Sequence, residues 1–152
     1  MIKENSKVKN FDLKFSEKNI IKFDELKGKK IVIFFYPKDD TPGCTKEAIS
    51  FSKHLNEFKK NNTIIFGVSK DTLEKHEKFK KKHNLGIELV SDTGEICETF
   101  GVWVEKSMYG KKYMGIERST FFIDENQVIK KIWRKVKVPG HVEEVLEIIK
   151  ES

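Results

Sequence analysis

The run KIVIFFYP at positions 30–37 constrains the fold more than any other feature of this sequence. Between Lys30 and Pro37 every residue is apolar or aromatic, and most are types that favour strands. A strand with one solvated face alternates apolar and polar residues, so an unbroken apolar run predicts a strand that is buried on both faces. Pro37 cannot donate to a sheet ladder and ends the strand. A strand of this kind indicates a sheet covered by helices on both sides.

Similar patterns predict the other elements. Apolar spacing predicts helices through 48–58 and over 71–84, 94–101 and 141–150. Strands are predicted at 11–15, 19–23, 63–69 and 87–92, with a hairpin at 119–133. This order indicates the α/β class, with a mixed central sheet and helices on both faces. With 152 residues and no linker-like segment, we expect a single domain spanning 1–152.

The charge pattern favours a solvated surface. The chain has 30 Lys and Arg against 24 Asp and Glu, a formal net charge of +6. The lysines are scattered and mixed with acidic residues, so no nucleic-acid partner is predicted. No run approaches the roughly 18 apolar residues of a membrane span, and the N-terminal stretch lacks the apolar segment of a secretory signal. We therefore expect a cytoplasmic protein that does not contact a membrane.

Metal and cofactor sites are not predicted. The two cysteines, Cys44 and Cys97, are too few for a disulfide scaffold, and their spacing fits no zinc motif. His54, His76 and His83 lie on predicted helices among charged residues, which indicates a solvated face. The glycines form no phosphate-binding loop.

Cys44 is the candidate reactive residue. It follows Pro42 and Gly43 and lies at the start of a predicted helix. The first helical turn has unpaired N–H groups and a partial positive charge, which favour the nucleophilic thiolate. The alternative for a lone cysteine is a small buried apolar side chain.

Three neighbours of Cys44 could assist such chemistry. The hydroxyl of Thr41 can bond the sulfur or an incoming substrate oxygen, and Pro37 can shield one side from water. Glu47, three residues after Cys44, can orient a cationic side chain by paired hydrogen bonds.

The stretch Pro37, Thr41, Cys44 resembles the peroxiredoxin active-site loop, P-x-x-x-T-x-x-C. The fuller TPGCTKEA and the segments 91–103 and 105–146 are similar to the bacterioferritin-comigratory-protein branch, also called PrxQ-like. The resemblance covers essentially the whole chain, and the loop motif is highly specific. It implies a thioredoxin-like (peroxiredoxin) fold.

The resemblance also implies a function. Peroxiredoxins reduce hydrogen peroxide or organic hydroperoxides through a cysteine that becomes a sulfenic acid, here Cys44. The family's arginine matches Arg118, and Tyr36 and Glu47 match positions that support the site. The implied partners are the peroxide and a reductant, which is thioredoxin, glutaredoxin or glutathione. No metal or organic cofactor is implied, and the expected state is a monomer or weak homodimer.

The chain departs from the branch at one position. Many members carry a second, resolving cysteine five residues after the first, where this chain has Ile49. Cys97 is either an inert buried thiol or a resolving cysteine reached by local unfolding, since a disulfide needs Cα atoms within about 7 Å. A one-cysteine peroxidase is favoured; the alternatives are a two-cysteine peroxidase and a non-catalytic basic binding protein. A thioredoxin-type C-x-x-C oxidoreductase is excluded because position 47 is Glu.

Overall fold

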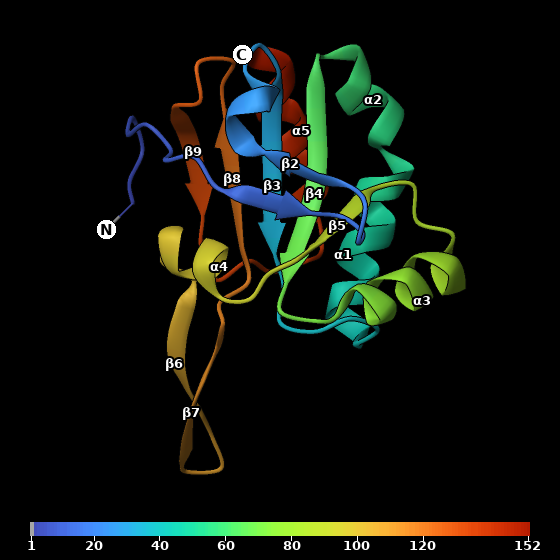
Figure 1. The fold of residues 1–152 in the computed structure, drawn as a ribbon, viewed down its shortest axis with the longest axis vertical. Coiled ribbons are helices and arrows are strands. Elements are labelled where there is room, and N and C mark those ends of the chain that lie inside the picture. Colours follow the sequence, from blue (N-terminus) through green and yellow to red (C-terminus); the bar gives the residue numbers. More distant parts are fainter. Residues whose placement is uncertain (1) are drawn as a thin grey trace.

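A computed structural model describes residues 2–152 and confirms the predicted α/β fold with a mixed sheet (Figure 1). Met1, which the predicted domain span includes, lies outside the described residues. The central sheet has the strand order β5-β4-β3-β8-β9, in which β3 and β4 and also β4 and β5 are parallel, while β8 pairs antiparallel with β3 and β9. Its strands are β3 (Lys30–Phe35), β4 (Thr63–Ser69), β5 (Glu88–Ser91), β8 (Ser119–Ile123) and β9 (Ile129–Trp133).

Five α-helices in the described part of the chain pack around the sheet. They are α1 (Pro42–Lys53), α2 (Leu55–Lys60), α3 (Leu73–His83), α4 (Glu95–Thr99) and α5 (His141–Glu151). The single helix expected through 48–58 is divided, because His54 leaves helical geometry with φ −95° and ψ 7° and separates α1 from α2. No helix in the range 2–152 is both long enough and apolar enough to cross a bilayer.

Two small antiparallel ribbons complete the described chain. The first pairs β1 (Asp12–Lys14) with β2 (Ile20–Lys22) and leads into the 3-10 turn η1 (Phe23–Leu26). The second pairs β6 (Trp103–Met108) with β7 (Lys111–Ile116) and extends away from the body of the molecule (Figure 1). The second ribbon is not predicted from the sequence, because most of its side chains are exposed and no apolar pattern marks them.

The sheet separates two hydrophobic cores, and β3 contributes to both. Its residues Val32 and Phe34 pack with α1, α2, α3 and α5, in what we call the helix-side core. Ile31, Ile33 and Phe35 point the other way and pack with α4 and the β1–β2 ribbon, in the ribbon-side core. Because successive strand residues point to opposite faces, the apolar run is buried on both sides, as predicted.

The pairing of β3 with β8 positions the candidate site. In this register Phe35, the last residue of β3, lies opposite Ser119, the first residue of β8. The loop that leaves β3 toward α1 therefore starts beside the residue that precedes β8. That residue is Arg118.

Candidate active site

The start of α1 places Cys44. The helix begins at Pro42, a favoured residue for the first helical position, and Thr41 precedes it as an extended N-cap with φ −90° and ψ 155°. Cys44 is therefore in the first turn, where backbone N–H groups have no partner within the helix. Its side chain is only 1% exposed and belongs to the helix-side core. The unpaired N–H groups and the positive end of the helix favour an anion at this position, whereas burial opposes one.

Arg118 joins Cys44 to Glu47. Its Nη2 donates to Cys44 Sγ across 3.2 Å, and its Nη1 donates to Glu47 Oε1 across 2.7 Å. The guanidinium also lies against Gly43, where an added Cβ would be 3.1 Å from Nη2. The absence of a side chain at Gly43 thus gives the arginine room to reach the sulfur.

The charges of this group are strongly coupled. Glu47 is completely buried, and its Oε2 has no hydrogen-bond partner among the described residues. Burial raises the pKa of Glu47 to about 7, although the positive charge of Arg118 opposes the shift. Burial alone lowers the pKa of Arg118, but the negative charges of Glu47 and Cys44 outweigh it and raise that pKa overall. Arg118 therefore remains a cation beside the sulfur.

Three other predicted residues make no hydrogen bond to Cys44. The hydroxyl of Thr41 is half-buried and donates to the carbonyl of Lys38 across 2.9 Å, and Pro37 is exposed. Tyr36 is buried, and its hydroxyl donates to Asp39 Oδ1 across 2.6 Å. Burial, followed by the charge of Asp39, raises the pKa of Tyr36 well above its ordinary value. The roles predicted for these three residues remain predictions.

Cys97 lies on the other side of the sheet. It is fully buried in α4, within the ribbon-side core, whereas Cys44 belongs to the helix-side core. Its backbone N–H donates to Asp92 Oδ2 across 2.9 Å. Burial and then the carboxylate of Asp92 raise the pKa of Cys97 far above the usual thiol range. The Cys97 side chain is a neutral thiol, and the central sheet separates it from Cys44.

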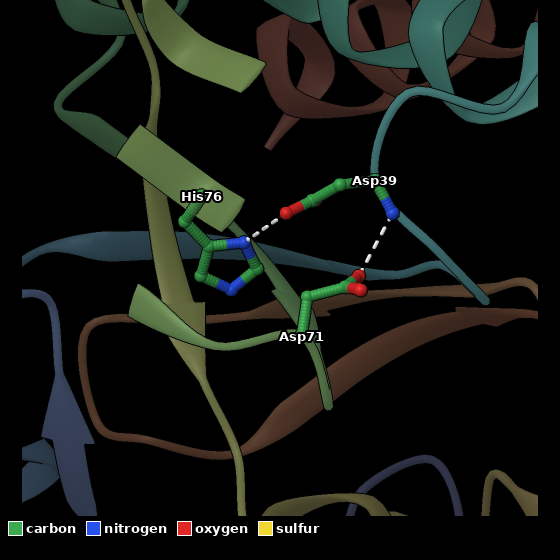
Figure 2. Close-up of side chains that lie close together, drawn as sticks. All are labelled: Asp39, Asp71 and His76. Carbon is green, nitrogen blue, oxygen red and sulfur yellow. Dashed lines mark hydrogen bonds and ion pairs between the residues drawn. The ribbon is translucent and has the colours of Figure 1, made fainter. Parts of the chain in front are cut away.

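The prediction that His76 lies on a solvated face is wrong. His76 is 3% exposed, and its Nδ1 lies 2.7 Å from Asp39 Oδ2 (Figure 2). The prediction was wrong because α3 contains many charged residues, which made the whole helix look solvated. The helical spacing could have revealed the inward position, because His76 comes three residues after Leu73 and three before Phe79, the apolar positions of this helix.

Asp39, Asp71 and His76 have ligand-type atoms within 4.8 Å of one another, a spacing compatible with a metal site. Both ring nitrogens of His76 already face acceptors, Asp39 Oδ2 at 2.7 Å and the carbonyl of Val90 at 3.0 Å. A metal ion needs a free imidazole nitrogen, and this arrangement offers none. The cluster is better described as a hydrogen-bonded network.

Glu47 predicts a specific dependence of stability on pH. Its pKa in the folded protein, about 7, is above the ordinary 4.5, so the folded state binds this proton more tightly than the unfolded state does. The stability that it contributes is therefore fully present below about pH 4.5 and is lost as the pH rises to about 7. Relative to the parent, the free energy of unfolding of Glu47→Gln should rise by about 2.5 kcal/mol between pH 5 and pH 8, at about 1.4 kcal/mol per pKa unit.

Urea unfolding of both proteins at the two pH values measures this difference. Glu74→Gln, which removes an exposed glutamate of α3, is the matched control and should leave the pH dependence of the parent unchanged. A stability difference between parent and Glu47→Gln that is the same at pH 5 and pH 8 would contradict the raised pKa.

Comparison with known proteins identifies one family and several similar proteins. Residues 5–132 match the AhpC/TSA family. The chain is 50% identical over 137 residues to the putative peroxiredoxin Bcp of Coxiella burnetii, covering 90% of this chain and 91% of that protein. It is 49% identical over 146 residues to the peroxiredoxin Bcp of Bacillus subtilis, covering 95% and 93% of the two chains.

Solved structures resemble the whole fold. A structure of the bacterioferritin comigratory protein of Xanthomonas campestris, studied for alkyl peroxide reduction activity, has a TM-score of 0.88 and 42% identity, over 93% of this chain and 90% of that one. A cysteine-to-serine mutant of PrxQ from Xylella fastidiosa has a TM-score of 0.94 and 36% identity, over 99% and 97%.

Proposed function

The chain belongs to the AhpC/TSA family and is a peroxiredoxin, and from this premise we propose that Cys44 is the thiol that reduces hydrogen peroxide and organic hydroperoxides. The observation that carries the assignment is the 3.2 Å hydrogen bond from Arg118 Nη2 to Cys44 Sγ at the N-terminus of α1. A fixed cation and free backbone N–H groups converge on one sulfur there, which is what a reactive thiolate requires.

The reaction uses the residues in contact with that sulfur. The Cys44 thiolate attacks one peroxide oxygen, so an S–O bond forms as the O–O bond breaks. The other oxygen leaves with the bonding electron pair, takes up a proton and departs as water or alcohol, and the cysteine becomes a sulfenic acid. Negative charge moves from the sulfur to the leaving oxygen, and the Arg118 guanidinium beside that sulfur supplies a donor that stabilises this shift. Thr41 is the proposed second donor, a role that requires its hydroxyl to leave the Lys38 carbonyl.

We further propose a one-cysteine cycle. Ile49 occupies the position where many members of the branch have a resolving cysteine, and its side chain is 42% exposed. Cys97 is on the opposite face of the sheet and is held as a neutral thiol. An external thiol then attacks the Cys44 sulfenic acid, which releases water and forms a mixed disulfide that a second thiol reduces. Thioredoxin, glutaredoxin and glutathione are the candidate reductants.

Mass spectrometry tests the assignment of Cys44. Treatment with one equivalent of peroxide, in the presence of a reagent that traps sulfenic acids, should label Cys44 in nearly every molecule and leave Cys97 unlabelled. Label on Cys97 alone would contradict the assignment of Cys44 as the reacting thiol.

The predicted location of the protein remains the cytoplasm, and its predicted state remains a monomer or weak homodimer.

Cys97→Ala is expected to leave the peroxidase rate, with an external thiol as reductant, within about twofold of the parent. Cys97 does not contact the reacting sulfur, so the substitution removes only apolar burial, at a cost of about 1 kcal/mol of stability. Steady-state peroxide consumption measures the rate, and non-reducing gels of the oxidised parent should show little intramolecular disulfide. A quantitative Cys44–Cys97 disulfide, with loss of recycling in Cys97→Ala, would instead establish a two-cysteine enzyme.

A further inference from the structure

The loop at 37–41 contains one buried carboxylate among exposed neighbours. It joins β3 to α1, and Pro37, Lys38 and Asp40 are all exposed, whereas Asp39 is only 9% exposed. Burying a carboxylate costs free energy unless the group is paired and hydrogen-bonded. The position of Asp39 therefore needs a compensating set of contacts.

Asp39 is held through three polar groups. Its Oδ1 accepts from the Tyr36 hydroxyl across 2.6 Å, and its Oδ2 lies 2.7 Å from His76 Nδ1. Its backbone N–H donates to Asp71 Oδ2 across 2.8 Å (Figure 2). These contacts tie the loop to the end of β3, to α3 and to Asp71, the second residue after β4.

The proton positions on His76 follow from its partners. The Val90 carbonyl, 3.0 Å from Nε2, can only accept, so Nε2 carries a hydrogen. Nδ1 faces a carboxylate across 2.7 Å, so one proton lies between His76 and Asp39. Through His76 the loop is therefore linked to β5 as well, and every element of this chain of contacts belongs to the packed body of the molecule.

The network lies close to the start of α1. Only Asp40, in a left-handed conformation with φ 59°, and the N-cap Thr41 separate Asp39 from the first helical residue. Cys44 comes from α1 and Arg118 from the segment before β8, so their 3.2 Å contact depends on how α1 is seated. We propose that Asp39 and His76 are positioning residues, which hold this loop so that Cys44 meets Arg118. This proposal rests on the proposed function of Cys44.

A second, exposed set of contacts joins the same loop to the same helix. Asp40 lies 2.7 Å from Lys82 Nζ and 2.9 Å from His83 Nε2, and the Asp40 side chain is 42% exposed. Exposed ion pairs contribute little to holding a structure. Asp40→Asn, which tolerates the left-handed conformation, therefore provides a matched control in which the exposed contacts are weakened and the buried ones remain.

The experiment compares three variants in single-turnover oxidation by hydrogen peroxide, well below the unfolding temperature of each. Asp39→Ala should lose about tenfold or more in rate, since small misplacements of reacting groups cost one to two orders of magnitude. Asp39→Asn should stay within about threefold of the parent. Its amide oxygen can accept from Tyr36, and its NH₂ can donate to Nδ1 of a neutral His76. Asp40→Asn should match the parent.

The rescue by asparagine separates positioning from a general loss of stability. A parent-like rate in Asp39→Ala, an equal loss in Asp39→Ala and Asp39→Asn, or an equal loss in Asp40→Asn would each overturn the proposal. If Asp39→Ala does not fold, Asp39→Leu fills the same space without hydrogen bonds and should show the same loss. A far-downfield proton signal from the shared proton of the parent, absent in Asp39→Asn, is the expected spectroscopic signature.

Cys44→Ser, assayed beside these variants, distinguishes the two hypotheses. If Cys44→Ser still reduces peroxide, the proposed function fails. If Cys44→Ser is inactive while Asp39→Ala keeps the parent rate, only the positioning role of Asp39 and His76 fails.

Discussion

Cys44→Ser is expected to abolish peroxide reduction, with a loss of more than about a thousandfold, while the fold is retained. Serine fills nearly the same buried space but offers no accessible anion at neutral pH, so the attacking group is lost rather than weakened. Removal of a covalent nucleophile has effects of this size or larger in other enzymes. Stopped-flow peroxide consumption measures the rate, and circular dichroism measures the fold.

Cys97→Ala is the matched control, because it also removes one buried thiol but from the opposite core. It should consume peroxide at close to the parent rate. A Cys44→Ser protein that is folded and as active as Cys97→Ala would remove Cys44 from the mechanism.

Arg118→Met should slow the oxidation of Cys44 by about a hundredfold or more, which is the usual cost of losing one preorganised donor at a reacting atom. Methionine keeps much of the apolar stem but neither of the hydrogen bonds, 3.2 Å to Cys44 and 2.7 Å to Glu47. Glu47 would lose its counterion, and its pKa would rise further, because Arg118 is what lowers it. The carboxyl would then be protonated at neutral pH, which limits the cost to the fold.

Arg134→Met is the control for Arg118→Met. Arg134 pairs with Glu117 at 3.5 Å and donates to the carbonyl of Gly101, and it makes no hydrogen bond to Cys44. Single-turnover oxidation followed by intrinsic tryptophan fluorescence should show the loss only in Arg118→Met. An equal loss in both variants would mean that a general change in charge, rather than the contact with the sulfur, controls the rate.

Local patterns were sufficient to predict the main elements and the place of Cys44 at the start of a helix. The apolar run of β3 predicted a strand buried on both faces, and the two cores confirm it. The proline and glycine before Cys44 predicted that the cysteine starts a helix, and α1 begins at Pro42. Each of these inferences depends on residues that are close in the sequence, where steric and hydrogen-bonding preferences act directly.

Features that depend on distant partners could not be predicted in the same way. Arg118 is 74 residues from Cys44 and was suggested only by the family resemblance. The buried contact between Asp39 and His76 spans 37 residues, and nothing near either residue indicates its partner. The β6–β7 ribbon was missed because its exposed side chains carry no burial pattern.

The pairing of β8 with β3 has a consequence for the order in which parts of the molecule fold. These strands are about ninety residues apart in the chain, and closing so long a loop is among the slower steps of folding. Cys44 and the rest of α1 are made of local contacts and can form early. Arg118 reaches the sulfur only after β8 has joined β3. A chain in which β8 has not yet paired with β3 therefore carries Cys44 without the Arg118 cation beside it. Under the proposed function, full reactivity toward peroxide is then expected only once the sheet is assembled.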